Sequence, residues 1–187
     1  MSDRNRKIVE AAASVFARYG VGKTTMNDIA REAGIARQTL YNSYPGKDEV
    51  LRATVRHFHD LTLANVEAAW TDETGFAGKI DRFFELGPLA WFDLVQSAPD
   101  ASELIDGIHT VAADELKHSA EVWEDRFAAL LIQHAPAPRL DTLDVTALAE
   151  FLYSASLNAK YGAESRAVLE LRLSILKASV LALLGLN

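Results

Sequence analysis

The chain lacks cysteine and has no long apolar run. Without cysteine it can form neither a disulfide nor a metal site with thiolate ligands, and this absence is typical of a reducing compartment. No stretch reaches the about 18 uninterrupted apolar residues that a bilayer-spanning helix needs, so we predict no membrane partner. The first residues are charged and show no apolar run before a cleavage site, so we expect no secretory signal and a cytoplasmic protein.

Patterns typical of catalysis or metal binding are also scarce. Of the five histidines, only His57 and His59 lie close in sequence. Two residues apart on a helix, they point to different sides and cannot bind one ion together. No Ser/His/Asp spacing and no paired-carboxylate motif stands out. We therefore predict no metal, no cofactor and no enzymatic activity.

Positive charge is in deficit, because 19 lysines and arginines face 26 aspartates and glutamates, giving a net charge of −7. As an average, this charge argues against nucleic-acid binding. Residues 1–52 differ, with nine basic residues against six acidic ones, whereas the remainder has ten against twenty. A mildly basic head on an acidic body predicts that only the head meets an anionic polymer.

Apolar residues recur at helical spacing along almost the whole chain, as Ile8, Ala12 and Phe16 illustrate. Gly20 can end the first helix. A bend is expected at Gly87–Pro88, because proline removes a backbone donor. No segment shows sustained strand alternation, so the predicted fold class is all-α. About nine helices are expected, near residues 8–19, 25–33, 36–44, 47 onward, 76–97, 101–108, 111–134, 143–160 and 165–184.

The segment GVGKTT, residues 20–25, looks like the phosphate-binding loop of a nucleotide hydrolase. That loop has the form GxxxxGK[ST] between a buried strand and a helix. Here the first glycine would be residue 17, which is alanine, and the preceding residues have helical period. A nucleotide hydrolase stays an alternative, but the pattern favours a plain connection. Gly20 and Gly22 would end one helix, and Thr25, with Asp28 three residues later, would cap the next.

Two short helices joined by a tight turn follow, with the sequence MNDIAREAGIARQTLYNSY over residues 26–44. Ala30 is small enough to let the helices cross closely. Gly34 makes the turn, and Ile35 and Leu40 pack where the two helices meet. This is the layout of a helix-turn-helix, whose second helix enters the major groove of DNA.

The same region resembles the N-terminal signature of the tetracycline-repressor (TetR) family of transcriptional regulators. There are two departures from it: Ala36, where the family often has a capping serine, and the pair Asn42–Ser43, where an aromatic residue or histidine is common. The resemblance covers roughly residues 8–52, and the matching residues are Thr25, Ile29, Ala30, Ala33, Gly34, Ile35, Thr39, Leu40, Tyr41, Tyr44, Lys47 and Leu51.

The resemblance implies a helix-turn-helix DNA-binding domain over residues 1–50 and a helical effector-binding and dimerisation domain over residues 51–187. The implied function is a ligand-responsive regulator, expected to be a repressor, that binds a near-palindromic operator in double-stranded DNA as a homodimer. By the same resemblance, the effector would shift the long fourth helix and so change the spacing of the two heads.

The first turn of the second short helix carries the residues expected to read bases. Arg37 can form a fork to guanine, Gln38 can pair with adenine, and Thr39 can touch a thymine methyl group or a phosphate. A role for Arg37 limited to gripping phosphate stays open. By resemblance, the remaining contacts fall on phosphates and fix the register on the duplex. These residues are Thr25, Tyr41, Asn42, Ser43 and Lys47.

The last two helices carry small and apolar residues that fit a helical interface. Two such helices from each of two chains would form a four-helix interface. The same residues would also serve an intramolecular core, and the resemblance favours the dimer. They are Leu148, Leu152, Ala155, Leu169, Leu173, Leu176 and Val180.

The body is rich in aromatic residues, most of which are expected in its core. Some come from three different long helices, where members of the family enclose an effector pocket. We therefore expect an unidentified small-molecule effector that is mostly apolar or aromatic. The expected lining residues, with core packing as the alternative for each, are Phe84, Trp91, Trp123, Phe127 and Asn158. A helical small-molecule-binding or scaffold protein without DNA binding is a further alternative, which the uncapped Ala36 and the acidic body keep open.

Overall fold

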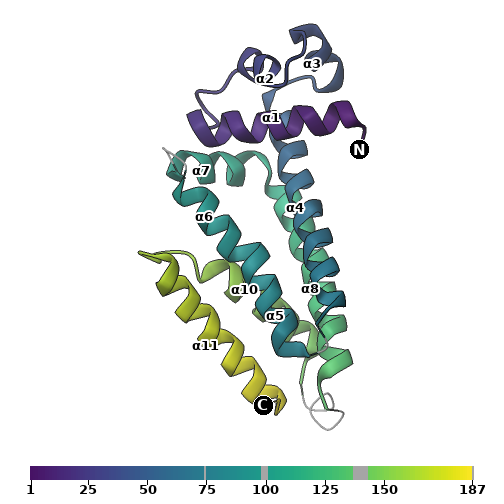
Figure 1. The fold of residues 1–187 in the computed structure, drawn as a ribbon, viewed down its shortest axis with the longest axis vertical. Coiled ribbons are helices and arrows are strands. Elements are labelled where there is room, and N and C mark those ends of the chain that lie inside the picture. Colours follow the sequence, from purple (N-terminus) through teal and green to yellow (C-terminus); the bar gives the residue numbers. More distant parts are fainter. Residues whose placement is uncertain (74, 98–100, 137–142, 187) are drawn as a thin grey trace. The chain divides into compact units, whose positions relative to one another are not determined.

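The computed structural model describes residues 1–73, 75–97, 101–136 and 143–186, which form helices with no strand among them (Figure 1). The run from Phe76 to Gln96 is continuous, and counting it as one helix gives, within the described residues, the nine that the sequence predicts. The all-α fold class is thereby confirmed. The elements are α1 (Asp3–Tyr19), α2 (Met26–Glu32), α3 (Arg37–Ser43), α4 (Lys47–Thr71), α5 (Phe76–Phe84), η1 (Glu85–Leu89), α6 (Ala90–Gln96), α7 (Ala101–Val111), α8 (Ala113–His134), α10 (Val145–Asn158) and α11 (Arg166–Leu184).

A proline lies inside the run from Phe76 to Gln96. Pro88 has no backbone N–H and cannot continue an α-helical hydrogen-bond ladder. The chain forms the π-helix η1 there, a wider turn that absorbs such an interruption. The irregularity that the sequence predicts at Gly87–Pro88 corresponds to this element.

The chain divides into two compact units. The first comprises Met1–Leu61 and Leu94–Ser119, and the second comprises Thr62–Asp93 and Ala120–Asn187. The first unit therefore contains α7 and the start of α8 as well as α1 to α3. The expected division at residue 50 concerns function and stays a prediction, whereas the packing assigns residues far along the sequence to the N-terminal unit.

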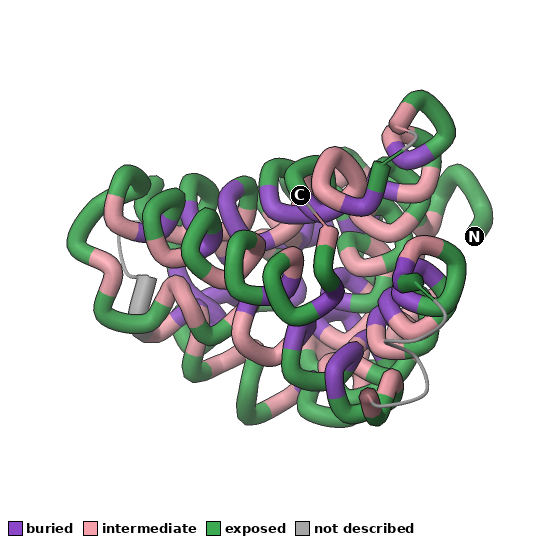
Figure 2. Tube along the Cα trace, turned by 90° about the horizontal axis from the view of Figure 1, so that it is seen from below, coloured by how far each residue is buried: buried purple, intermediate pink, exposed green. Residues whose placement is uncertain are grey.

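Each unit has an apolar core, and Figure 2 shows buried residues recurring along one side of the helices. In the first unit, α1 contributes Ile8, Ala12 and Phe16, so its predicted apolar face is confirmed. Leu40 of α3 is fully buried, and Leu104 of α7 packs in the same core. The support for the N-terminal helices thus comes partly from α7.

The two short helices begin differently. Thr25 caps α2, because its hydroxyl accepts from the Asp28 N–H at 3.3 Å while its own N–H donates to the Asp28 carboxylate at 3.1 Å. The Thr25 hydroxyl also donates to that carboxylate, and these hydrogen bonds lower the pKa of Asp28. The predicted capping box is confirmed. In α3, by contrast, the N-cap residue Ala36 supplies no side-chain hydrogen bond.

We predict that Ala36→Ser stabilises the protein. Ala36 already has an extended backbone, with φ −65° and ψ 142°, from which a serine hydroxyl can accept from the first turn of α3. The free energy of unfolding should rise by about 1 kcal/mol, measured by urea unfolding at unchanged slope. Thr25→Ala, which removes the existing cap of α2, should lower it by a similar amount. Equal unfolding midpoints for the two variants would contradict the assigned roles of these caps.

Candidate nucleic-acid interface

The turn between α2 and α3 is a tight glycine-dependent motif. Gly34 has a φ of 65°, which lies in the left-handed region that favours glycine. The Ile35 N–H donates to the Ala30 carbonyl at 3.0 Å, and the Gly34 N–H donates to the Arg31 carbonyl at 3.2 Å. This pair of bonds is a Schellman motif, and it turns the chain directly from α2 into α3.

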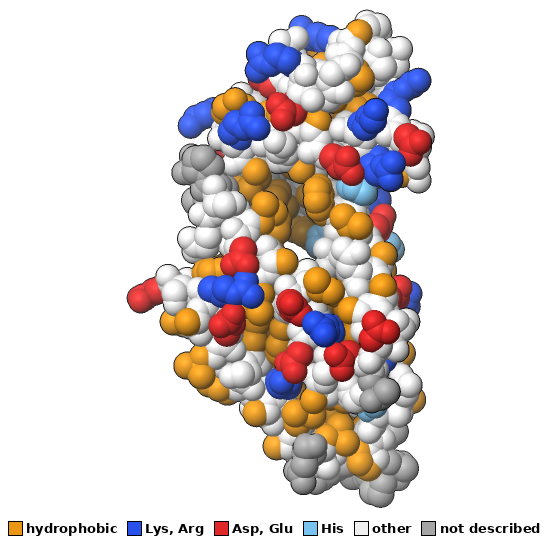
Figure 3. Space-filling view, in the orientation of Figure 1, with side chains coloured by type: hydrophobic (Ala, Val, Ile, Leu, Met, Phe, Trp, Pro, Cys, Tyr) orange, Lys and Arg blue, Asp and Glu red, His pale blue; other side chains and the backbone are white. Residues whose placement is uncertain are grey.

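The buried Leu40 leaves the opposite side of α3 open to solvent. Arg37, Gln38, Tyr41 and Asn42 are exposed on that side. Several lysine and arginine side chains project around α1–α3, at the top of Figure 3. All four side chains of this exposed edge carry hydrogen-bonding groups, as an element that enters a DNA groove requires.

Two side-chain pairs, each four residues apart, order this edge. The Arg37 guanidinium donates to the Tyr41 hydroxyl at 3.3 Å and lies 5.4 Å from the centre of the Tyr41 ring. The Gln38 amide donates to the Asn42 side-chain oxygen at 3.1 Å. Both pairs restrict side chains that are expected to contact DNA, which lowers the entropy lost on binding.

The other expected contact residues lie at the margins of this edge. Thr39 and Ser43 are half-buried, and the Ser43 hydroxyl donates to the Thr39 carbonyl at 3.4 Å. Thr25 is exposed at the N-terminus of α2. Lys47 is half-buried at the start of α4, where its ammonium group donates to the carbonyl oxygens of Val21 and Gly22 at 2.7 and 3.2 Å. The expected phosphate contact of Lys47 stays a prediction beside this internal role.

The loop between α1 and α2 contains the GVGKTT segment. It joins two helices, and its buried Thr24 hydroxyl donates to the Gly20 carbonyl at 2.6 Å. Its amides do bind an anion, but the anion is the carboxylate of Glu103 in α7. This carboxylate accepts from the Val21 N–H at 2.7 Å and from the Gly22 N–H. The loop is therefore a connection within the chain's own fold, as the sequence favours.

Glu103 is absent from the sequence predictions. It lies 82 residues from Val21 along the chain, and no local pattern links the two. The glycines are the one available signal. A Cβ at Gly20 would overlap the Glu103 carboxylate, and one at Gly107 would come within 2.7 Å of the Val21 side chain. Glycine at these positions permits the close approach of α7 to the loop.

The residues expected around an effector differ in how far they are buried. Phe84, Trp123 and Phe127 are buried, and they pack in the aromatic core of the second unit around Phe83. The Phe83 ring centre lies 4.9 Å from that of Trp123 and 4.8 Å from that of Phe127. These rings contact one another, which matches the core alternative that the sequence leaves open. Their effector role stays a prediction.

The remaining two expected effector residues are more accessible. Asn158, at the end of α10, is exposed. Trp91 of α6 is half-buried, and the Lys160 ammonium group lies 5.6 Å from its ring centre. Burial lowers the pKa of Lys160. The effector role of Asn158 and Trp91 likewise stays a prediction.

Most residues expected at a dimer interface pack inside the second unit. Those buried are Leu148, Leu152, Leu169, Leu173 and Val180. Ala155 and Leu176 are half-buried. A partner chain could not reach the five buried side chains directly, so these positions serve the intramolecular core that the sequence gives as the alternative. The dimer itself stays a prediction.

The outer side of α10 and α11 is also apolar. Leu171 and Ile175 of α11 are 60% and 58% exposed, and Phe151 of α10 is 54% exposed. We call these three residues, with the 44% exposed Leu183, the outer apolar face. Hydrophobic side chains are visible along the α11 region in Figure 3.

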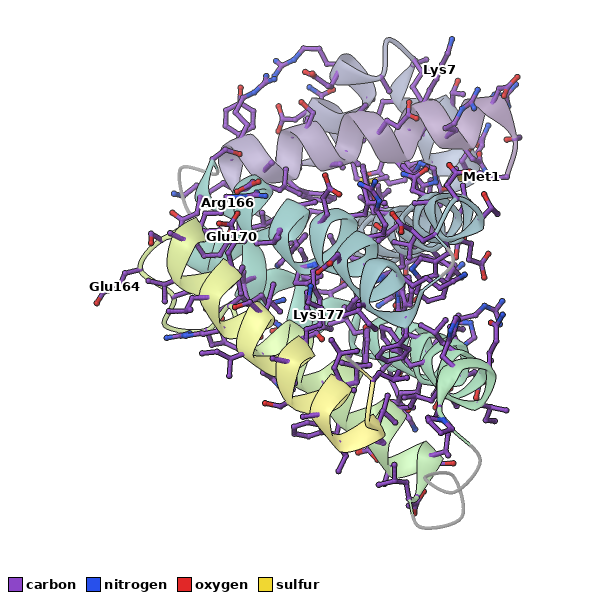
Figure 4. The ribbon with its side chains drawn as sticks, turned by 60° about the horizontal axis from the view of Figure 1, so that its bottom comes forward. Met1, Lys7, Glu164, Arg166, Glu170 and Lys177 are labelled. Atoms are coloured by element: carbon purple, nitrogen blue, oxygen red, sulfur yellow. The ribbon has the colours of Figure 1, made fainter. Side chains whose placement is uncertain are left out.

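Ion pairs hold the inner side of α11 to its own unit. Lys177 contacts Asp81 of α5, with distances of 2.6 and 2.7 Å between its nitrogen and the two carboxylate oxygens. Arg166 pairs with Asp93 of α6 and, at 2.8 Å, with Glu170. Arg166, Glu170 and Lys177 follow one another along α11 in Figure 4. These contacts fix which side of the helix remains open.

Two further features are absent from the described residues. No helix there is long and apolar enough to cross a bilayer. No three His, Cys, Asp or Glu side chains in that part of the chain gather closely enough to hold a metal ion.

Comparison with known proteins points to the same N-terminal module. Residues 8–54 match the family model of bacterial regulatory proteins, tetR family. The HTH-type transcriptional repressor LfrR of Mycolicibacterium smegmatis is 35% identical over 91 residues, which cover 46% of this chain and 47% of LfrR. The HTH-type transcriptional regulator SrpR of Pseudomonas putida is 32% identical over 135 residues, which cover 70% of this chain and 59% of SrpR. The matches thus span about half the length of these curated relatives.

The fold of the whole chain is also similar to that of a solved structure. A transcriptional regulator from Rhodococcus sp. Rha1 superposes with a TM-score of 0.74 and 17% identity, covering 95% of this chain and 96% of that one. At this identity the likeness concerns the fold alone.

The geometry and the sequence matches agree on the class of the N-terminal segment, a helix-turn-helix of the kind found in DNA-binding proteins. Residues 8–54 thus carry the N-terminal module of the tetR family of bacterial regulatory proteins. This is a family of transcriptional regulators rather than enzymes, and its members bind DNA as dimers and respond to small molecules.

The contact between α7 and the loop gives a stability prediction. Gly107→Ala should lower the free energy of unfolding by about 1–3 kcal/mol, because the added methyl group overpacks against Val21. This sign opposes the gain of about 1 kcal/mol that alanine normally brings over glycine inside a helix. Thermal or urea unfolding measures the difference.

A double variant supplies the control. Val21→Ala removes both γ carbons that the Gly107 methyl group would meet and leaves only the Cβ of residue 21 in contact with it. The double variant should therefore lose less stability than the sum of the single losses. Additive losses, or a stabilising Gly107→Ala, would show that α7 does not pack on the loop in this way.

Proposed function

We propose that this protein is a transcriptional regulator that binds double-stranded DNA through α3. The observation that carries the proposal is the exposed polar edge of α3, fixed in place by the buried Leu40 and the Gly34 turn. The match of residues 8–54 to the tetR family supports it. Binding to duplex DNA tests it, and failure of the intact protein to bind any duplex at low ionic strength would favour a helical ligand-binding or scaffold protein instead.

Within this proposal, α3 lies in the major groove. Arg37 and Gln38 at its first turn contact base edges, and Thr39 contacts a thymine methyl group or a phosphate. The residues that hold the phosphates on either side are Thr25, Tyr41, Asn42, Ser43 and Lys47. Such contacts position the protein without reading sequence.

The protein acts as a dimer, with the outer apolar face as the contact surface. Phe151, Leu171 and Ile175 are large apolar side chains left open to solvent on neighbouring helices, α10 and α11. Burying such side chains contributes about 1.5–3 kcal/mol each. The twofold symmetry of a homodimer matches two half-sites of a near-palindromic operator.

The regulator represses its target and is released by a small molecule. LfrR, one of its relatives, is named a transcriptional repressor. An apolar or aromatic effector fits the aromatic second unit, in which η1 separates Phe84 from Trp91, since π-helical turns often occur at functional sites. The protein would act in the cytoplasm, where its DNA target lies.

Arg37 provides the sharpest test of base reading. Arg37→Ala should weaken binding to the preferred operator by about 1–3 kcal/mol and relax the preference at one base pair. Arg37→Lys keeps the charge but loses the fork, so it should relax the same position. Titration of duplexes that carry each base at that position measures both effects.

Arg31→Ala is the matched control, because Arg31 is an exposed arginine of α2 outside the α3 edge. It should leave the base preference unchanged. If Arg37→Ala lowers affinity equally for all sequences and Arg37→Lys binds normally, Arg37 grips phosphate only.

The dimer is tested on the outer apolar face. Ile175→Asp should raise the dimer dissociation constant by about tenfold or more, because it places a charge in a surface that must lose water. Sedimentation velocity measures the shift. Leu94→Asp, which changes an apolar residue of similar exposure outside α10 and α11, should leave the dimer intact. If the two variants had equal dimer dissociation constants, the dimer interface would lie outside the outer apolar face.

A further inference from the structure

Two opposite charges hold the backbone of the same two residues in the first unit. Glu103 of α7 accepts from the N–H groups of Val21 and Gly22, and Lys47 of α4 donates to the carbonyl oxygens of the same two residues. We call these four residues the loop clamp. Both helices therefore contact one short stretch of backbone.

The loop clamp is stronger than an ordinary surface contact. Hydrogen bonds to charged groups are shorter and about twice as strong as those between neutral groups. The peptide group between Val21 and Gly22 donates its N–H to the Glu103 carboxylate and accepts from Lys47 through its carbonyl oxygen, so each of these two bonds polarises that peptide in the sense that strengthens the other. Val21 is buried, and the glycines on either side admit the Glu103 carboxylate to the backbone.

The clamped stretch leads directly into the helix-turn-helix. Lys23 follows it, and then comes Thr24, which is buried and donates through its hydroxyl to the Gly20 carbonyl. Thr25 is next and is the N-cap of α2, and α2 continues through the Gly34 turn into α3. The position of Val21 and Gly22 therefore sets where α2 begins, and with it the position of the α3 edge.

We infer that Glu103 is a positioning residue for DNA binding, which holds the helix-turn-helix in its binding arrangement through the loop clamp. This inference rests on the proposed DNA-binding function. It assigns to α7, outside residues 8–54, a residue that governs affinity without touching DNA. An effector that displaces α7 would release the clamp and weaken binding through this residue.

Glu103→Gln tests the inference, because glutamine presents a single acceptor oxygen and no charge to the two N–H groups. Removing a negative charge from a DNA-binding unit ordinarily strengthens binding to a polyanion. We expect Glu103→Gln to weaken DNA binding instead. The variant should bind duplex DNA at least about fivefold more weakly, and the Val21 and Gly22 amides should exchange about tenfold faster or more. Asp106→Asn removes an exposed carboxylate from the same helix and should bind as well as the wild type or better.

A measurement on the unchanged protein covers the case in which Glu103→Gln fails to fold. By linkage, DNA that prefers the clamped arrangement must in turn slow exchange of the Val21 and Gly22 amides. Unchanged or faster exchange with bound duplex overturns the inference, as does Glu103→Gln binding DNA as tightly as Asp106→Asn. In both cases wild-type binding leaves the proposed function standing. Wild-type protein that binds no duplex at low salt, with those amides still protected, overturns both.

Discussion

The exposed edge of α3 depends on one backbone constraint, the positive φ of Gly34. This residue lets the Ile35 N–H reach back to the Ala30 carbonyl, so the chain reverses with its helix-end groups satisfied. Leu40 then lies fully buried, so the polar residues on the opposite side of α3 face solvent. A side chain at residue 34 would strain the turn and displace the exposed edge of α3, even with every residue of that edge unchanged.

In the loop before α2, backbone N–H groups bind an anion, a chemistry that can hold either a ligand or part of the chain's own fold. Glycine-rich loops bind anions because their N–H groups can converge on one point. In nucleotide hydrolases the anion is a phosphate, whereas here it is the chain's own Glu103. The resemblance of GVGKTT to a phosphate loop is therefore chemically meaningful, although the loop joins two helices and serves the fold. Through it, α7 packs in the same unit as α2 and α3.

The sequence predicts local features well and long-range ones poorly. The Thr25 cap, the Gly34 turn and the irregularity at Pro88 follow from residues within a few positions of each other, where backbone sterics and hydrogen bonding decide the outcome. The Glu103 contact depends on two segments brought together by the fold, and no local signal contains it. α11 illustrates a second limit, because it is apolar on two sides. Periodicity finds Leu169 and Leu173, which face the core, but does not show that Leu171 and Ile175 remain open.

The central claim is that α3 reads duplex DNA as one half of a symmetric pair. Selection of bound sequences from a random duplex pool at low ionic strength tests it most directly. We expect enrichment of a near-palindrome whose two halves lie on the same side of the duplex, about one helical turn apart or a multiple of it. Recovery of no sequence, or of sequences without twofold symmetry, would contradict it.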